Sequence, residues 1–250
     1  MKTKTNITKA ALAACFLSVF AFFTACQKDA NPSMNNPSQN AGQSQVRFSN
    51  PNLVFPPMAH MSGKTYGEWG AEWWKWTVSF DCATSPHVAA TGSLQDQNQS
   101  GSVYFLAGAP FNMPAHRSAH VTSDQSLFFS LLARIEDDTT GIAGTGMSVT
   151  DYLTSSAIGA VDGVDILSAT LDGVTITNPT DFRAHSGLFS YTGNPAGCVI
   201  GVTGLPTDAV TDGYWLMLKP LPVGTHILHF TGGISGPGLI KDVTDTIYVN

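Results

Sequence analysis

The clearest pattern of apolar and polar positions along the chain lies in YGEWGAEWWKWTVSF, residues 66–80. At 100° per residue the large aromatic side chains fall within one arc of a helix. This aromatic stripe consists of Tyr66, Trp69, Trp73, Trp76 and Phe80. Glu72 and Lys75 fall on the opposite face, where a spacing of three residues lets their charges pair. The pattern therefore predicts an amphipathic helix whose aromatic stripe packs on a sheet.

The residues at the start of this helix support the same prediction. Thr65 and Glu68 have the spacing of a capping box, in which each side chain accepts a hydrogen bond from the other residue's backbone. Gly67 and Gly70 each cost about 1 kcal/mol in a helix relative to alanine. We therefore expect a neighbouring element to pack close to the helix backbone at these two glycines.

Two tryptophans are candidates for ligand contact because they lie outside the aromatic stripe. Trp74 lies beside the stripe on the same helix, and Trp215 lies in a later apolar run. The flat face of tryptophan offers a large contact area to a ligand. We expect Trp74 and Trp215 to be the more exposed tryptophans and the ones able to bind a ligand; the alternative is that both are scaffold.

From residue 102 onward the pattern is mostly period two, or short apolar runs broken by Gly, Pro and Asp. SVYFLAG and SLFFSLLA indicate buried strands, and VDILSATLDGVTIT indicates two strands joined by a turn at Asp172 and Gly173. Further strands are expected in FRAHSGLFSYTG, CVIGVTG, YWLMLK, THILHFTG and DTIYVN. A second short helix is expected at about Val149 to Ile158, with Ser148 as N-cap. The series predicts a mainly β fold, an Ig-like or jelly-roll-like β-sandwich with one Trp-rich N-terminal helix.

The N-terminus has the pattern of a targeting segment. Three lysines precede an apolar run from Ala10 to Ala25, which is too short and too abruptly ended for a spanning helix with stop-transfer flanks. The residues that end this run, FTAC, resemble a bacterial lipobox. The resemblance implies that residues 1–25 are a signal peptide and that Cys26 carries lipid. An ordinary secretory signal cleaved nearby and a buried apolar helix are the alternatives.

Residues 26–46 are almost entirely Asn, Gln, Ser, Pro, Gly and Ala. Such a segment cannot bury enough apolar surface to offset its ordering entropy, so we expect a disordered tether. Its first residues, Gln27, Lys28 and Asp29, resemble a short export signal that directs lipoproteins to the outer face of the outer membrane. Residues 47–250 are then expected to form a single β-rich domain.

Charge and cysteine content narrow the class of protein. Charged residues are 12% of the chain and the formal net charge is −6, which excludes the clustered basic surface of a nucleic-acid-binding protein. Of the four cysteines, Cys15 lies in the signal segment and Cys26 is the lipidation candidate. Cys82 and Cys198 remain as a possible disulfide in an oxidising compartment, with two free buried thiols as the alternative.

No histidine pattern in the sequence specifies a metal site. His226 and His229 are three apart in an expected strand, so they point to opposite faces and cannot bind one ion together. His116 and His120 share a face if the segment is extended, but two ligands do not make a site. His226 is expected to be a core histidine with ordinary hydrogen bonds. The sequence therefore predicts neither a bound metal nor a cofactor.

No arrangement of carboxylates in the sequence specifies a catalytic site. Glu68 and Glu72 are one helical turn apart, near the separation that glycosidases use, but solvated glutamates are also expected on that face. The chain contains no nucleophile elbow, phosphate-binding loop or zinc-protease motif. A hydrolase acting on glycan or peptide would need acids such as Glu72 or Asp138 to converge with a histidine such as His120.

Four stretches together resemble a family of uncharacterised secreted bacterial proteins. They are GKTYGEWGAEWWKWTVSF, GSVYFLAG, SLFFSLL and DGYWLMLKPLPVGTHILHFTGG. In that family a Trp-rich helix precedes a strand of this type, and a PLxxGxHxIxF hairpin lies near the end. The resemblance implies architecture and export but no chemistry. Members often carry extra cysteines around the strand of the GSVYFLAG type, and this chain has none there.

The sequence as a whole predicts a lipid-anchored protein of the bacterial cell envelope. We expect a non-enzymatic binding or surface-structural module on the outer membrane. Its expected partners are the membrane, through the lipid anchor, and a polysaccharide or an envelope protein. The alternative is the secreted hydrolase.

Overall fold

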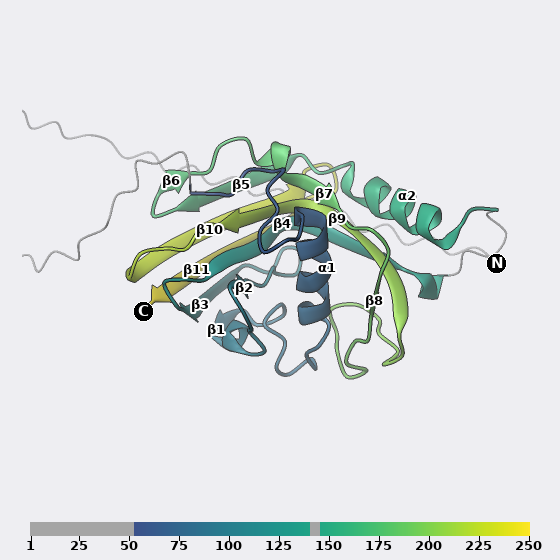
Figure 1. Ribbon diagram of the computed structural model, residues 1–250, viewed down its shortest axis with the longest axis horizontal. Helices are drawn as coiled ribbons and strands as arrows, with labels where there is room; N and C mark the ends of the chain where they lie inside the picture. Colours follow the sequence, from purple (N-terminus) through teal and green to yellow (C-terminus); the bar gives the residue numbers. More distant parts are fainter. Residues whose placement is uncertain (1–52, 141–145) are drawn as a thin grey trace, which may run out of the picture. The chain divides into compact units, whose positions relative to one another are not determined.

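Two β-sheets and two helices make up the part of the chain that the computed structural model describes, residues 53–140 and 146–250 (Figure 1). These residues fall within a unit that spans Gln45–Asn250. The predicted signal peptide 1–25, the lipidation candidate Cys26 and the tether 26–46 lie outside the described residues. No helix in the described ranges is long and apolar enough to cross a bilayer.

The first sheet has six strands. In spatial order they are β1 (Thr91–Gly92), β3 (Ala115–Val121), β11 (Leu239–Val249), β10 (Gly224–Ile234), β5 (Ile166–Leu171) and β6 (Val174–Thr175). Strands β10 and β11 form a long antiparallel hairpin, and β3 pairs in parallel with both β11 and β1. The predicted turn at Asp172 and Gly173 joins β5 to β6, and both residues adopt positive φ there.

The second sheet is built around two strands of twelve residues each. In spatial order its strands are β2 (Val103–Phe105), β4 (Ser126–Asp137), β9 (Thr207–Leu218) and β7 (Arg183–His185), and β8 (Phe189–Tyr191) also pairs with β9. Strand β2 runs parallel to β4, whereas β9 is antiparallel to β4. Single 3₁₀ turns lie at η1 (Leu94–Asp96), η2 (Asp138–Thr140) and η3 (Pro179–Phe182).

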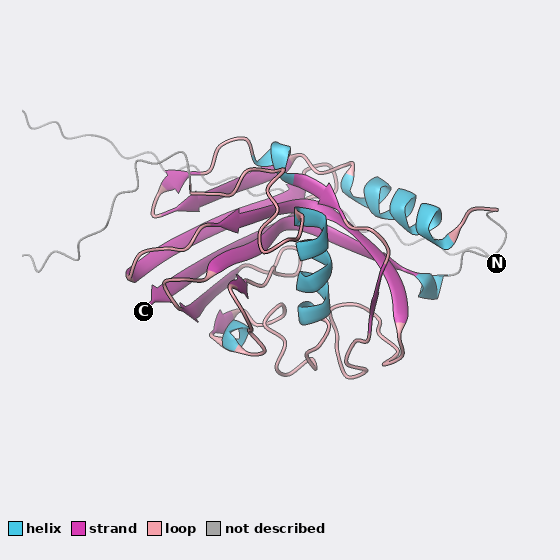
Figure 2. Cartoon of the chain, viewed as in Figure 1, coloured by secondary structure: helices cyan, strands magenta, loops and turns pink. Residues whose placement is uncertain are grey.

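The second sheet is covered on both faces, which explains the unbroken apolar run in β4. On one face, Phe128 stacks on Trp215 beneath the Trp-rich helix. On the other face, Phe129 contacts Phe230 of β10, with ring centres 4.7 Å apart. The predicted mainly β fold with two sheets is confirmed, and Figure 2 shows its strands and the two longer helices.

Helix α1 (Tyr66–Thr77) confirms the predicted cap and both predicted close approaches. Thr65 accepts a hydrogen bond from the backbone of Glu68, and the Glu68 carboxylate accepts one from the backbone of Thr65. A Cβ at Gly67 would lie 2.0 Å from the backbone oxygen of His185, and a Cβ at Gly70 would lie 2.8 Å from the ring of Trp215. The helix therefore lies directly on β7 and β9, and only glycine permits that distance.

Helix α2 (Val149–Val161) confirms the second predicted helix and is three residues longer than expected. Ser148 is the N-cap, and its side chain accepts a hydrogen bond from the backbone of Asp151. Leu153 and Ala157 are buried against Val210 of β9. This helix covers the part of β4 and β9 that extends beyond the first sheet.

The strand prediction is wrong at one segment and missed two strands, β3 and the two-residue β1. The segment CVIGVTG, residues 198–204, is a loop rather than a strand; its apolar side chains pack on the core without a strand partner. Strand β3 was missed, because an arginine and two histidines interrupt the apolar signal of AHRSAHV. Period two is nevertheless present there, since Ala115, Arg117, Ala119 and Val121 are its buried positions.

Candidate functional site

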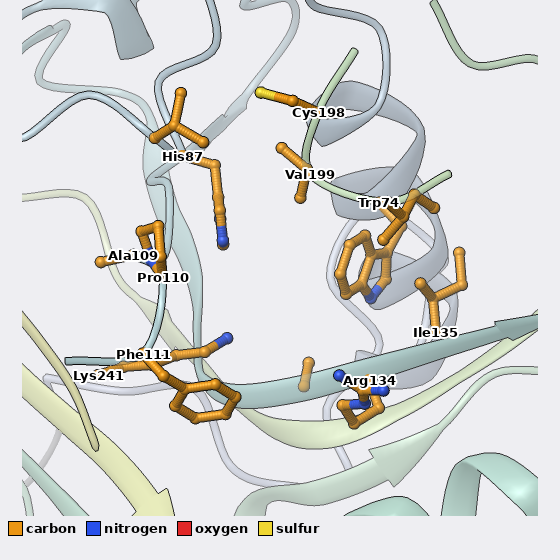
Figure 3. A pocket seen from close by; sticks show the side chains of 13 residues that line it. Trp74, His87, Ala109, Pro110, Phe111, Arg134, Ile135, Cys198, Val199 and Lys241 are labelled. Carbon is orange, nitrogen blue, oxygen red and sulfur yellow. The ribbon is translucent and has the colours of Figure 1, made fainter. Parts of the chain in front are cut away.

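A cavity of about 270 Å³ lies beside α1 and is lined by residues of that helix, of β4 and β11, and of three loop segments (Figure 3). Thirteen residues line it: Trp74, His87, Val88, Ala109, Pro110, Phe111, Ala133, Arg134, Ile135, Cys198, Val199, Ile200 and Lys241. The volume is near the lower end for small-molecule sites, which are roughly 300–1,000 Å³. Figure 3 shows His87 and Lys241 extending into the cavity opposite the ring of Trp74.

The indole N–H of Trp74 has no hydrogen-bond partner among the described residues, although the side chain is only 6% exposed. The other four tryptophans each donate to a backbone carbonyl, at Met61 (from Trp69), Leu106 (Trp73), Gln97 (Trp76) and Ala184 (Trp215). Buried indole N–H groups normally find a partner. Trp74 is thus the exception among the five, and it is the one that lines the cavity.

His87 is buried in the opposite wall, 8% exposed, and its Nδ1 also lacks a partner. Burial first, and then the charges of Lys241 and Arg117, hold the pKa of His87 well below its usual range. The imidazole is therefore neutral at pH 7. A Cβ at Gly108 would lie 3.2 Å from Cε1 of His87, so this glycine makes room for the ring.

Lys241 occupies an inward-facing position of β11, on the same face of the strand as Val243, Asp245 and Ile247. Its side chain is 8% exposed and has no carboxylate partner among the described residues. Burial, and then the charge of Arg134, lower its pKa to about 8. The group is consequently still a cation at pH 7, held in a largely desolvated position.

The position of Lys241 is fixed through the neighbouring loop. Its Nζ lies 5.3 Å from the ring centre of Phe111, within range of a cation–π contact. Next to both residues, the backbone N–H of Asn112 donates to the carbonyl of Ile240 at 2.7 Å, and the Asn112 side chain accepts from the Ile240 N–H at 3.1 Å. These two bonds tie the loop to β11 and hold the ring against the lysine.

A buried polar cluster holds the wall that carries His87. Arg117 of β3 donates to the carbonyls of Pro86, Ala107 and Gly108. Its Nε lies 3.6 Å from Oδ1 of Asp245, which also accepts from Gln95. Both loop segments that flank His87 and Gly108 are therefore anchored to the first sheet by one guanidinium.

The outer wall is the loop that contains Cys198, Val199 and Ile200. Cys198 forms a disulfide with Cys82, and the two Cα atoms are 5.2 Å apart. The backbone N–H of Cys82 donates to Ala196, and that of Asn194 donates to Val78 just after α1. The disulfide and these two bonds fasten the outer wall to the end of the Trp-rich helix.

The two tryptophans expected to be exposed are both buried, so that expectation is wrong. Trp74 lines the cavity, whereas Trp215 is 0% exposed and its indole N–H donates a hydrogen bond to the carbonyl of Ala184. Trp215 contacts Trp73 and stacks on Phe128, because β9 places it directly under α1. It is therefore a core residue and does not line this cavity.

The histidines and acids considered in the sequence have separate structural partners. Nδ1 of His226 contacts Asp172 at 2.8 Å and its Nε2 contacts the carbonyl of Pro222, as expected for a core histidine. His120 is exposed and contacts Asp96. Glu72 pairs with Lys64 and Lys75, and Glu68 serves the helix cap. Among the described residues no three His, Cys, Asp or Glu side chains form a group suited to a metal ion.

His87 and Lys241 were not predicted as site residues from the sequence. A signal for Lys241 was present, because the alternation in DTIYVN extends back through Val243 and places Lys241 on the inward face. A lysine at an inward-facing strand position is rare and suggests a role beyond packing. His87 lies in a loop with no periodic pattern, so only the fold brings it to the cavity.

No protein-family model matches the chain, and comparison with curated proteins and with solved structures finds no match. The resemblance to a family of secreted bacterial proteins therefore stays a prediction.

Proposed function

We propose that the protein is a cell-envelope lipoprotein whose domain binds a small molecule in the cavity beside α1. One observation carries the binding part of this proposal. Three polar side chains that are more than nine-tenths buried, Trp74, His87 and Lys241, line a single cavity. Among the described residues the indole N–H of Trp74 and Nδ1 of His87 have no hydrogen-bond partner, and Lys241 has no carboxylate partner. Buried polar groups are costly unless they are paired, and a bound ligand would pair them.

The way the tryptophans are buried favours a small ligand over a polysaccharide. A sugar chain is usually held on an open aromatic surface, but four of the five tryptophans are buried and Trp69 is half-buried. The cavity, by contrast, is concave and mostly apolar with a few convergent polar groups, which is the usual composition of a small-molecule site.

The geometry favours binding over hydrolysis. A hydrolytic centre needs a nucleophile and a base within hydrogen-bond distance of each other. Nδ1 of His87 and Oγ of Ser130 lie near the same glycine, yet each lacks a hydrogen-bond partner, so they do not form such a pair. No Asp or Glu is among the described residues that line the cavity.

A ligand screen with a blocked cavity tests the binding proposal. The full-length protein is screened against a small-molecule library by thermal shift, and hits are titrated by calorimetry. Val199→Trp should fill the cavity and abolish binding of every hit, whereas Val223→Trp, at a position 68% exposed and outside the cavity, should leave it intact. Hits that bind the Val199→Trp variant unchanged, or a screen with no hits, would contradict the proposal.

The lipoprotein part of the proposal rests on the sequence and has its own test. Labelled palmitate should appear on the protein in growing cells and vanish in the Cys26→Ser variant. Incorporation that survives this substitution would contradict lipidation at Cys26. Protease treatment of intact cells then reports whether the anchored domain faces outward.

A further inference from the structure

The polar side chains that line the cavity are mainly hydrogen-bond donors. The indole N–H of Trp74 and the ammonium of Lys241 can only donate. Arg134 lines the same cavity and also only donates, while neutral His87 can donate or accept. No Asp or Glu is among the described lining residues. A ligand with acceptor oxygens would therefore be complementary to the cavity.

The buried charge of the cavity amounts to one cation. Lys241 is buried and lacks a counter-ion among the described residues. His87 is neutral, and Arg134 is half exposed with Glu136 3.9 Å away. Burying a charge without a partner is strongly unfavourable. A ligand with a single negative charge would balance Lys241, whereas a neutral ligand would leave the cation unpaired.

The apolar part of the cavity wall indicates that the ligand also has an apolar part. Phe111, Ile135, Val199 and Ile200 line the cavity with aromatic and aliphatic surface. A small hydrophilic dianion such as phosphate would leave this surface without contacts and would exceed the one buried positive charge. An apolar body attached to one anionic group matches both parts of the wall.

We infer that the ligand is a small organic monocarboxylate, with its carboxylate paired to Lys241, its apolar body against Phe111 and Ile200, and an oxygen accepting from Trp74. This inference rests on the proposed function, because it concerns the ligand of the same cavity. It assigns Lys241 to charge recognition and Trp74 to a hydrogen bond that an amide oxygen of the ligand could also accept.

Matched pairs of probes test this inference. The full-length protein is titrated by calorimetry with acetate, hexanoate, benzoate and phenylacetate, and with the corresponding neutral amides and inorganic phosphate. We expect at least one of the larger carboxylates to bind about tenfold or more tighter than its amide, since pairing with a charged group is worth about 1.5–3 kcal/mol.

Two Lys→Met variants test whether Lys241 is the residue responsible for the preference for carboxylate over amide. Lys241→Met keeps most of the side-chain volume and should remove the preference for carboxylate over amide. Lys219→Met is the control, because Nζ of Lys219 also lies over a ring, 5.7 Å from the centre of Phe55, but outside the cavity; the preference should survive there. Trp74→Phe should weaken both probes, the carboxylate somewhat more than the amide, by about two- to tenfold, because the indole N–H donates to an oxygen of either group.

The possible outcomes separate this inference from the proposed function. Equal binding of amides and carboxylates would overturn the carboxylate assignment and leave the cavity as a binding site. Tighter binding of phosphate, or a preference that persists in Lys241→Met, would also overturn the inference. If no probe binds, the inference fails, and the library screen with the Val199→Trp variant decides the proposed function separately.

Discussion

The two sides of α1 use the same residue type in opposite ways. On one side, Trp73 packs against Trp215 and donates its N–H to Leu106, so its ring and its polar atom are both satisfied. On the other side, the adjacent Trp74 is also buried, but its N–H has no partner among the described residues. Burial alone therefore does not distinguish scaffold from site; the state of the polar atom does.

The largest expected effect comes from releasing the outer wall of the cavity. Replacing Cys82 and Cys198 together by alanine should lower the free energy of unfolding by about 4–5 kcal/mol, because the disulfide closes a loop of more than a hundred residues. Urea unfolding of the double variant measures this loss. Ligand affinity should fall as well, since Val199 and Ile200 belong to the released wall; unchanged affinity would show that the wall is not part of the site.

The next effect is a gain in stability from removing the buried cation. Each pKa unit corresponds to about 1.4 kcal/mol, and the pKa of Lys241 is lowered from 10.5 to about 8 in the folded protein. Lys241→Met should therefore raise the free energy of unfolding at pH 7 by about 3 kcal/mol. A scaffold lysine should not behave this way, and Lys219→Met should change stability by less than about 0.5 kcal/mol.

The effect of Lys241→Met on stability should depend on pH. The folded protein gives up the Lys241 proton near pH 8, and the unfolded chain does so only near 10.5. The cost of the buried cation is thus present in full below about pH 8 and disappears as pH rises to 10.5. His87 is already neutral and the Arg134 guanidinium stays charged across this window. The stability gap between Lys241→Met and the natural protein should close over that range; a constant gap would contradict a buried cation.

The smallest effect tests the tryptophan comparison directly. Trp73→Phe and Trp74→Phe remove the same atoms from neighbouring positions of one helix, but only the first leaves a carbonyl, that of Leu106, without its donor. Trp73→Phe should therefore cost about 1–2 kcal/mol more than Trp74→Phe in chemical unfolding. Equal losses would mean that the N–H groups of the two residues are equivalent and that Trp74 is ordinary scaffold.

Local patterns in the sequence predicted the helices and most strands, because each of these elements carries its own period and caps. Tyr66, Trp73 and Trp76 repeat at helical spacing, and Thr65 with Glu68 marks the start of α1. The glycines predicted a close approach without identifying the partner, which turned out to be Trp215 and the backbone of His185. Strand β3 was missed because its inward Arg117 serves a buried polar cluster and breaks the apolar pattern.

The cavity was only half predictable. Trp74 was identified because it falls off the aromatic stripe, although the expected reason, exposure, was wrong. Lys241 and His87 come from the last strand and from a loop, and their convergence depends on the sheet order and on contacts between distant segments. The local periodicity of a sequence does not predict which residues from distant segments come together.

The most direct test of the binding site is the indole spectrum of the protein labelled with ¹⁵N at tryptophan. The five side-chain N–H signals are assigned by single Trp→Phe variants, and the small-molecule library is then added. We predict that bound compounds shift the Trp74 signal most, while the signals of Trp73 and Trp215, whose N–H groups are hydrogen-bonded within the core, stay in place. Bound compounds that leave the Trp74 signal unmoved would contradict the assignment of the cavity as the site.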